Sequence, residues 1–121
     1  MTSPLQIYRV NMSAEMGIFQ QLMAVIGDRK RNPPNRSYTT SLLEAGVAKI
    51  GEKILEEAAE VVDAAHQSDD DAHLIHEAAD LIFHLFVMLG YRDIPITAVE
   101  QELQRRFGTS GLDEKESRGQ K

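Results

Sequence analysis

Two short acidic motifs carry the residue types best suited to chemistry in this chain of 121 residues. Glu57 and Glu60 stand three residues apart, and Glu77 and Asp80 repeat that spacing further along. Side chains three apart on a helix share a face and lie within about 6 Å of each other. Clustered carboxylates repel one another unless a cation neutralises them, and oxygen ligands suit Mg²⁺ or Mn²⁺. If both motifs are helical and meet, the spacing predicts a divalent-metal site.

Two further residues belong to the same helical stripes. Glu56 is about 40° from Glu60 around a helix axis, and His84 is about 20° from Glu77. Glu56 extends the acidic set. His84 stands between apolar residues, so it is either a site residue or a buried histidine whose hydrogen bonds are satisfied. The other histidines are expected on the surface, around the turn between the two motifs: His66, His73 and His76.

The elements that must position these motifs are helices, because apolar residues recur at intervals of three and four and no long segment alternates as a strand does. Capping residues and glycines mark where the helices begin and end. The predicted helices span about residues 13–27, 41–45, 47–66, 69–89 and 97–107. A basic link with two prolines occupies residues 28–39. The fold class is therefore predicted to be all-α.

The two long helices are joined by only a few polar residues, so they are expected to pack antiparallel and to bring the acidic motifs together. This predicts one domain over residues 1–121, a bundle of about five helices around an antiparallel central pair. Residues 1–12 and 112–121 are expected to be flexible. The helix at 69–89 is the most apolar, and one thin layer cannot cover it on every side, so a homodimer is expected.

Composition narrows the possible functions. A formal net charge of −6 argues against broad binding of nucleic acids, which requires a surplus of Lys and Arg. The absence of cysteine excludes disulfides, thiolate zinc sites and a cysteine nucleophile. No uninterrupted apolar run approaches the ~20 residues that span a bilayer, and the N-terminus lacks the features of a secretion signal. We therefore expect a cytoplasmic protein without a membrane partner.

A longer combination of motifs resembles a known family. It consists of Ser37-Tyr38-Thr39, Gly46-x-x-Lys49-Ile50-x-x-Lys53, Glu56-Glu57-Ala-x-Glu60 and Glu77-Ala-Ala-Asp80-Leu-x-x-His84. This combination is similar to the phosphoribosyl-ATP pyrophosphatases of histidine biosynthesis in their free-standing form. The similarity covers about residues 14–118. Either acidic motif alone is shared with the wider MazG-like group of all-α nucleoside-triphosphate pyrophosphatases.

The resemblance implies a Mg²⁺-dependent homodimer, with Mn²⁺ as a possible substitute, that hydrolyses phosphoribosyl-ATP to phosphoribosyl-AMP and pyrophosphate. Its metal ligands are expected to be Glu57, Glu60, Glu77 and Asp80. A carboxylate that is not fully engaged with metal would orient the attacking water and accept its proton. Glu56 or Glu57 is expected to fill this catalytic role.

The resemblance also implies which residues bind the substrate. Lys49 and Lys53 would face the phosphates, although surface ion pairs with Glu52 and Glu56 explain either lysine equally well. Further substrate contacts are expected from the link and from the C-terminal segment. Arg29 and Lys30 would hold the additional phosphoribosyl group, Tyr38 would stack on the adenine or anchor the link, and Arg118 would fold over the ligand.

Two other functions are compatible with the residues. One is a pyrophosphatase that removes free or damaged nucleoside triphosphates, although the basic link and the Ser-Tyr-Thr run speak against it. The other is a non-catalytic helical module whose acidic residues are ordinary solvated surface, since Glu-x-x-Glu is common on exposed helices. An enzyme requires the carboxylates to meet around one centre, whereas the module does not.

Overall fold

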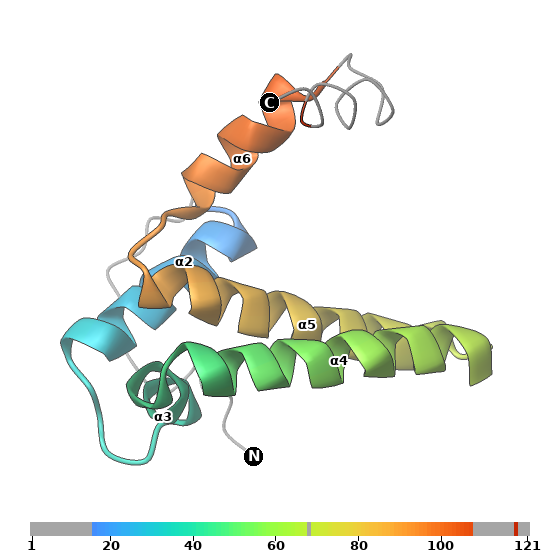
Figure 1. The fold of residues 1–121 in the computed structure, drawn as a ribbon, viewed down its shortest axis with the longest axis horizontal. Helices are drawn as coiled ribbons and strands as arrows, with labels where there is room; N and C mark the ends of the chain where they lie inside the picture. The colour runs from blue at the N-terminus through green and yellow to red at the C-terminus, as the bar shows by residue number, and fades with distance from the viewer. Residues whose placement is uncertain (1–15, 68, 108–117, 119–121) are drawn as a thin grey trace.

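The computed structural model describes residues 16–67, 69–107 and 118, and all regular structure in these residues is helical (Figure 1). Within residues 16–107, the structure describes five helices in chain order: α2 (Ile18–Arg31), α3 (Tyr38–Ala45), α4 (Val47–Gln67), α5 (Asp71–Tyr91) and α6 (Ile96–Arg105). The predicted all-α class is thereby confirmed. The segments expected to be flexible lie outside the described residues, except for Arg118.

The long helices α4 and α5 form an antiparallel hairpin, as the short polar connection predicted (Figure 1). α2 packs against α5 at the end away from the hairpin turn, and α3 lies beside the start of α4. α6 projects away from this body and touches mainly α2. The core lies where the first four of these helices converge, with a contribution from the start of α6. It consists of Ile26, Leu42, Leu43, Ile50, Phe86, Val87 and Ile96.

The first helix ends later than the sequence predicted. α2 runs through Gly27 to Arg31, so residues 28–31 are helical and the link is shorter than expected. The prediction treated Gly27 as a stop, but a glycine inside a helix costs only about 1 kcal/mol relative to alanine. The helix stops instead at Asn32, immediately before Pro33. Proline disfavours helical backbone in the residue that precedes it, which explains this position.

The start of α3 was also predicted wrongly. The capping residue is Ser37, whose hydroxyl accepts a hydrogen bond from the Thr40 N–H at 3.1 Å. Ser41 lies inside the helix, where its hydroxyl donates to the Tyr38 carbonyl at 2.6 Å. Gly46 separates α3 from α4 as expected, with a φ of 91° that side-chain-bearing residues rarely adopt.

The ends of α5 and α6 agree with the prediction to within two residues. Asp70 caps α5 by accepting from the Ala72 N–H at 3.0 Å, while Ser68 lies outside the described residues. α5 continues through Gly90 to Tyr91, because Gly90 is buried against α2 and does not end the helix. α6 begins directly after Pro95.

The contact between α2 and α5 at Gly90 leads to a stability prediction. A Cβ at Gly90 would lie 2.5 Å from Cγ2 of the buried Ile26, so Gly90→Ala should lower the free energy of unfolding by about 1–3 kcal/mol. Gly27→Ala is the control, because its Cβ would meet only the end of the flexible Arg31 side chain. Thermal melts of both variants test this, and a Gly90→Ala protein as stable as the parent would contradict the packing.

Candidate active site

The acidic motifs meet across the α4–α5 hairpin. One carboxylate oxygen each from Glu57 and Glu60 on α4 and from Glu77 on α5 lie within 4.8 Å of one another. Glu77 also belongs to a second group of the same size, with Asp80 and His76. The two groups share Glu77, so the four predicted carboxylates form one continuous site. They are not separate patches of solvated surface.

Two of these carboxylates are partly withdrawn from water. The Glu77 side chain is only 12% exposed, and Glu57 is half-buried. When ionised, the Oε2 atoms of Glu57 and Glu77 have no hydrogen-bond donor among the described residues. An ionised oxygen that is buried without a partner costs free energy of folding. A cation bound between these oxygens would remove that cost.

The pKa values of Glu57 and Glu77 are both raised by the surroundings of these two carboxylates. Burial, a hydrogen bond shared with Glu60 and the negative charges of Glu60, Asp80 and Glu77 together raise the pKa of Glu57 to about 7. The pKa of Glu77 is also raised, first by its hydrogen bond with Glu60, then by burial and by the charges of Glu60 and Asp80. The cluster therefore retains a proton near neutral pH unless another positive charge is present.

The donor set suits a divalent cation with hard character. The four carboxylates offer oxygen ligands, the described residues place no lysine or arginine in an ion pair with them, and the chain contains no thiolate. Oxygen-rich sites of this kind favour Mg²⁺ and Mn²⁺. Glu57, Glu60, Glu77 and Asp80 are the residues that could hold such an ion.

Two histidines contact the acidic set, which the sequence analysis did not foresee. His76 Nε2 lies 3.4 Å from Asp80 Oδ2, and His73 Nε2 lies 3.5 Å from Glu77 Oε1. Both histidines are on the surface, as expected, but each is four residues before its acidic neighbour on α5. That spacing places side chains one above the other on a helix and was the signal available in the sequence.

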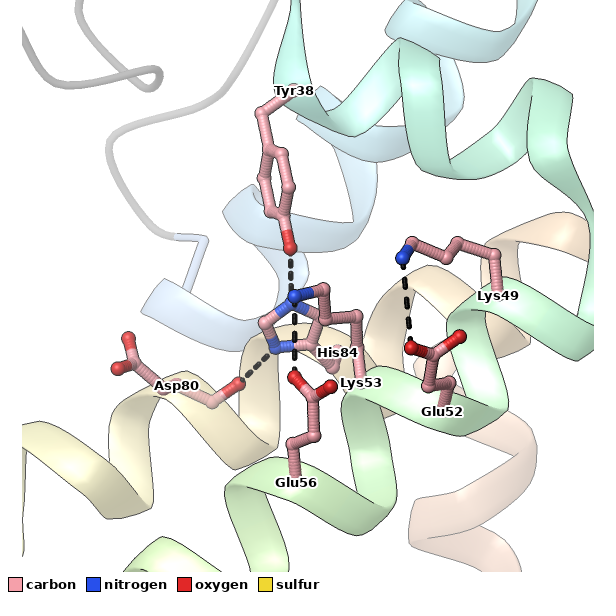
Figure 2. Close-up of polar contacts among 7 residues, drawn as sticks. All are labelled: Tyr38, Lys49, Glu52, Lys53, Glu56, Asp80 and His84. Carbon is pink, nitrogen blue, oxygen red and sulfur yellow. Dashed lines mark hydrogen bonds and ion pairs between the residues drawn. The ribbon is translucent and has the colours of Figure 1, made fainter.

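The two lysines lie on α4, on the N-terminal side of the acidic motif, and both form ion pairs on the helix surface (Figure 2). Lys49 Nζ is 3.7 Å from Glu52, and Lys53 Nζ is 3.2 Å from Glu56. These are the surface pairs that the sequence analysis weighed as an alternative. Glu56 is consequently held by Lys53 and lies outside the two carboxylate groups described above.

His84 is a buried histidine with both ring nitrogens engaged. Its side chain is 5% exposed, its Nε2 lies 2.9 Å from the Tyr38 hydroxyl and its Nδ1 lies 2.8 Å from the Asp80 carbonyl oxygen (Figure 2). The structure thus favours the second of the two interpretations of His84. The same hydrogen bonds place Tyr38 beside the acidic site, because His84 bonds both to Tyr38 and to the carbonyl of Asp80, whose carboxylate belongs to that site.

The basic residues predicted to bind substrate lie in different places. Arg29 belongs to α2, is 1% exposed and lines a cavity beside Tyr38 and Asp80. Lys30 binds the end of α5: its ammonium donates to the Tyr91 carbonyl at 2.8 Å and to Asp93 at 3.0 Å. Arg118 is exposed, and its neighbours in the chain lie outside the described residues. Arg29 thus shares a cavity wall with Asp80 of the acidic site.

The comparison with protein families agrees with this geometry. The model of the phosphoribosyl-ATP pyrophosphohydrolase family matches residues 19–107, which include α3 to α6 and nearly all of α2. The chain belongs to this family. The family acts in histidine biosynthesis, and the resemblance inferred from the motifs is confirmed.

Curated relatives in the family are similar over most of their length. A phosphoribosyl-ATP pyrophosphatase from Trichlorobacter lovleyi is 51% identical over 107 residues, which cover 88% of this chain and 98% of the relative. The protein of the same name from Geotalea daltonii is 50% identical over 84% of this chain and 94% of its own. The one from Rhodopirellula baltica is 46% identical over 81% and 83%.

The raised pKa of Glu57 predicts how stability depends on pH in metal-free protein. Between the ordinary value of 4.5 and about 7, the folded state binds more protons than the unfolded state, so the free energy of unfolding should fall as pH rises through this window. Glu57→Gln removes the titrating group. In EDTA at pH 8 this variant should therefore unfold at a higher temperature than the parent, with the difference shrinking toward pH 4.5.

Glu100→Gln, which alters an exposed carboxylate on α6, is the control for this experiment and should follow the parent at every pH. Thermal melts across the pH range provide the measurement. Equal pH dependence in the parent and in Glu57→Gln would show that Glu57 is not destabilised by its neighbours.

Proposed function

We propose that this chain is a phosphoribosyl-ATP pyrophosphatase. It hydrolyses 1-(5-phosphoribosyl)-ATP to 1-(5-phosphoribosyl)-AMP and pyrophosphate, the second step of histidine biosynthesis, in the cytoplasm. The observation that carries the proposal is the four-carboxylate site on α4 and α5, within a chain whose family match spans both helices. Curated relatives that bear this enzyme's name support the choice of substrate over free nucleoside triphosphates.

In this proposal Glu57, Glu60, Glu77 and Asp80 hold Mg²⁺, for which Mn²⁺ can substitute. The bound ion supplies positive charge to the phosphate oxygens, where negative charge is concentrated during phosphoryl transfer. The unpartnered oxygens of Glu57 and Glu77 support this assignment, because they are buried ligand atoms that lack a donor. The retained proton near neutral pH supports it as well, since a cation would displace it.

The proton acceptor for the attacking water is Glu57 or Glu56. Glu57 lies in the site, where a carboxylate that is not fully engaged with the ion would accept the proton of the attacking water. Glu56 is the alternative because its carboxylate is outside the metal groups and is bound, among the described residues, by Lys53. Either residue would orient the water toward the α–β phosphoanhydride.

The substrate's negative charge is bound by cations from α4 and, in part, from α2. In the part of the chain that the structure describes, Lys49 and Lys53 are held by partly exposed ion pairs. Such pairs are worth little, so the lysines can move to phosphate oxygens at low cost. Arg29, Lys30 and Arg118 are proposed to contribute to the binding of the phosphoribosyl group. Tyr38, beside the site, is placed to contact the adenine.

The enzyme is further proposed to act as a homodimer. α5 is long and apolar enough to meet the length and composition criteria for a membrane span, and only 17% of the relevant window is buried within the chain. Large apolar side chains on both long helices are exposed: Val47, Leu55, Val62, Ile75 and Leu85. Leu55 and Ile75 each precede an acidic ligand by two positions, so they point about 160° away from it around their helices. A second copy would cover this face and leave the carboxylates accessible.

The activity proposal predicts a specific loss of turnover. Glu60→Gln and Asp80→Asn should each reduce release of pyrophosphate from phosphoribosyl-ATP by at least about 100-fold in Mg²⁺, because each removes a charged ligand. Glu100→Gln is the control and should retain activity. EDTA should abolish turnover in the parent, and Mg²⁺ or Mn²⁺ should restore it. Faster hydrolysis of dCTP or dUTP than of phosphoribosyl-ATP would instead favour a general nucleotide pyrophosphatase.

The dimer proposal is tested by mass measurement in solution. Leu55 is 73% exposed in the single chain, so Leu55→Glu should leave the monomer fold intact but place a charge in the dimer interface. Light scattering after size exclusion should show a dimer for the parent and a monomer for Leu55→Glu. Leu103→Glu, which alters an exposed leucine on α6, should remain dimeric. A monomeric parent would overturn the proposal.

A further inference from the structure

A cavity of about 470 Å³ adjoins the carboxylate site, between α2, α3 and α5. Its polar lining includes Asp80, Tyr38 and His84, so one metal-ligand candidate forms part of its wall. This volume falls within the usual range for small-molecule sites, about 300–1,000 Å³. A ligand whose phosphates lie at the carboxylates therefore has room for a further ring system next to them.

The remaining wall of the cavity suits a flat aromatic group. The rings of Tyr38 and Phe83 are stacked with centroids 6.2 Å apart and planes 20° from parallel. Phe83 meets the His84 ring edge-on at 5.1 Å, which holds both rings in place. Leu22, Val25 and Ile26 complete the apolar surface. Aromatic rings prefer such offset and edge contacts, so a purine would pack well here.

The hydrogen bonds of His84 determine what the Tyr38 hydroxyl can offer. The Asp80 carbonyl can only accept, so the hydrogen of the neutral His84 ring is on Nδ1. Nε2 is then an acceptor, and the Tyr38 hydroxyl at 2.9 Å must donate to it. The hydroxyl hydrogen is used in this bond. Tyr38 therefore presents only oxygen lone pairs to a third group.

The groups around Tyr38 keep its hydroxyl protonated. Burial raises the pKa of Tyr38, and the charges of Glu57, Glu56 and Asp80 raise it further, while the Lys53 ammonium lowers it. Lys53 is itself held by Glu56 at 3.2 Å. Arg29 also lines the cavity, but the residue is only 1% exposed to solvent. The acceptor that Tyr38 presents is thus the polar feature best placed to choose between ligands.

We propose that this cavity holds the purine of the substrate, and that Tyr38, positioned by His84, selects a base whose exocyclic group is a hydrogen-bond donor. In a purine substituted at N1, the ring nitrogen of that edge is blocked, and the group at C6 is the main polar feature left beside it. A nitrogen at C6 carries hydrogen and can donate to the Tyr38 oxygen. A carbonyl oxygen at C6 has no hydrogen to donate, so its lone pairs would repel those of the Tyr38 oxygen. This inference rests on the proposed function, because it assigns the base subsite of the same reaction.

Two nucleosides without phosphates test the inference in metal-free protein. 1-Methyladenosine carries nitrogen at C6 and 1-methylinosine carries oxygen. The titration is done above the pKa of 1-methyladenosine, where both nucleosides are uncharged and differ in the group at C6. The parent should bind 1-methyladenosine about 10-fold more tightly, as judged by chemical-shift titration of the protein. Tyr38→Phe keeps the ring and removes the acceptor, so it should bind both nucleosides with nearly equal affinity.

The same variant separates binding from chemistry in the complete reaction. With phosphoribosyl-ATP and Mg²⁺, Tyr38→Phe should raise KM about 3- to 10-fold while kcat stays within about 2-fold of the parent. Tyr91→Phe is the matched control, because it removes a tyrosine hydroxyl outside this cavity and should change neither KM nor the nucleoside preference.

The positioning role of His84 is tested by two amides. Asparagine can keep a donor near Nδ1 for the Asp80 carbonyl but offers nothing to Tyr38. Glutamine can place an amide oxygen near Nε2 and accept from Tyr38. His84→Gln should therefore retain most of the nucleoside preference, and His84→Asn should lose it. Tyr38→Phe combined with His84→Asn should lose no more than either change alone.

The outcomes distinguish this inference from the proposed function. If the parent does not release pyrophosphate from phosphoribosyl-ATP, the proposed function fails. If the parent is active but binds both nucleosides equally, or if Tyr38→Phe keeps the parent's preference, the assignment of the base subsite is wrong. If His84→Asn keeps the parent's preference for 1-methyladenosine, the positioning role of His84 is wrong and Tyr38 selects the base without it.

Discussion

Repulsion between like charges on α4 and α5 is the constraint around which this molecule is organised. Carboxylates of Glu57, Glu60 and Glu77 are held within 4.8 Å of one another although each would be more stable alone in water. The packing of the two long helices must supply the free energy that holds them there. The protein thus keeps a pre-formed site of clustered negative charge, and the cost of assembling it is met by folding.

The hairpin that carries the site has two chemically different sides. The acidic residues and Tyr38 lie on one side, where α2 and α3 add a cavity and a buried histidine. Leu55 and Ile75 are exposed and point away from the acidic residues of their own helices. The 3.6-residue period of the helix allows each of these 21-residue helices to carry acidic residues on one face and apolar residues on another. Leu55 and Ile75 therefore lie on different faces of their helices from the carboxylates.

The helices and the meeting of the acidic motifs were predictable from the sequence because they depend on local periodicity and on one short connection. Details that depend on tertiary contacts were not. Ser37 and Ser41 are both plausible caps, and only the path of the chain before α3 decides between them. The burial of Arg29 depends on where α2 meets α3 and α5. The contact of His76 with Asp80 was present as a spacing, but many equally spaced pairs on exposed helices have no function.

Lys30 joins the last turn of α2 to the last carbonyls of α5 and to Asp93 just beyond. These hydrogen bonds and the ion pair with Asp93 resist movement of α5 along its own axis. Displacement of a helix by one residue corresponds to about 1.5 Å of travel and about 100° of rotation, which would turn Glu77 and Asp80 away from their partners on α4. A basic residue outside the carboxylate cluster thereby limits axial movement of α5, and its removal would misalign the opposite half of that helix.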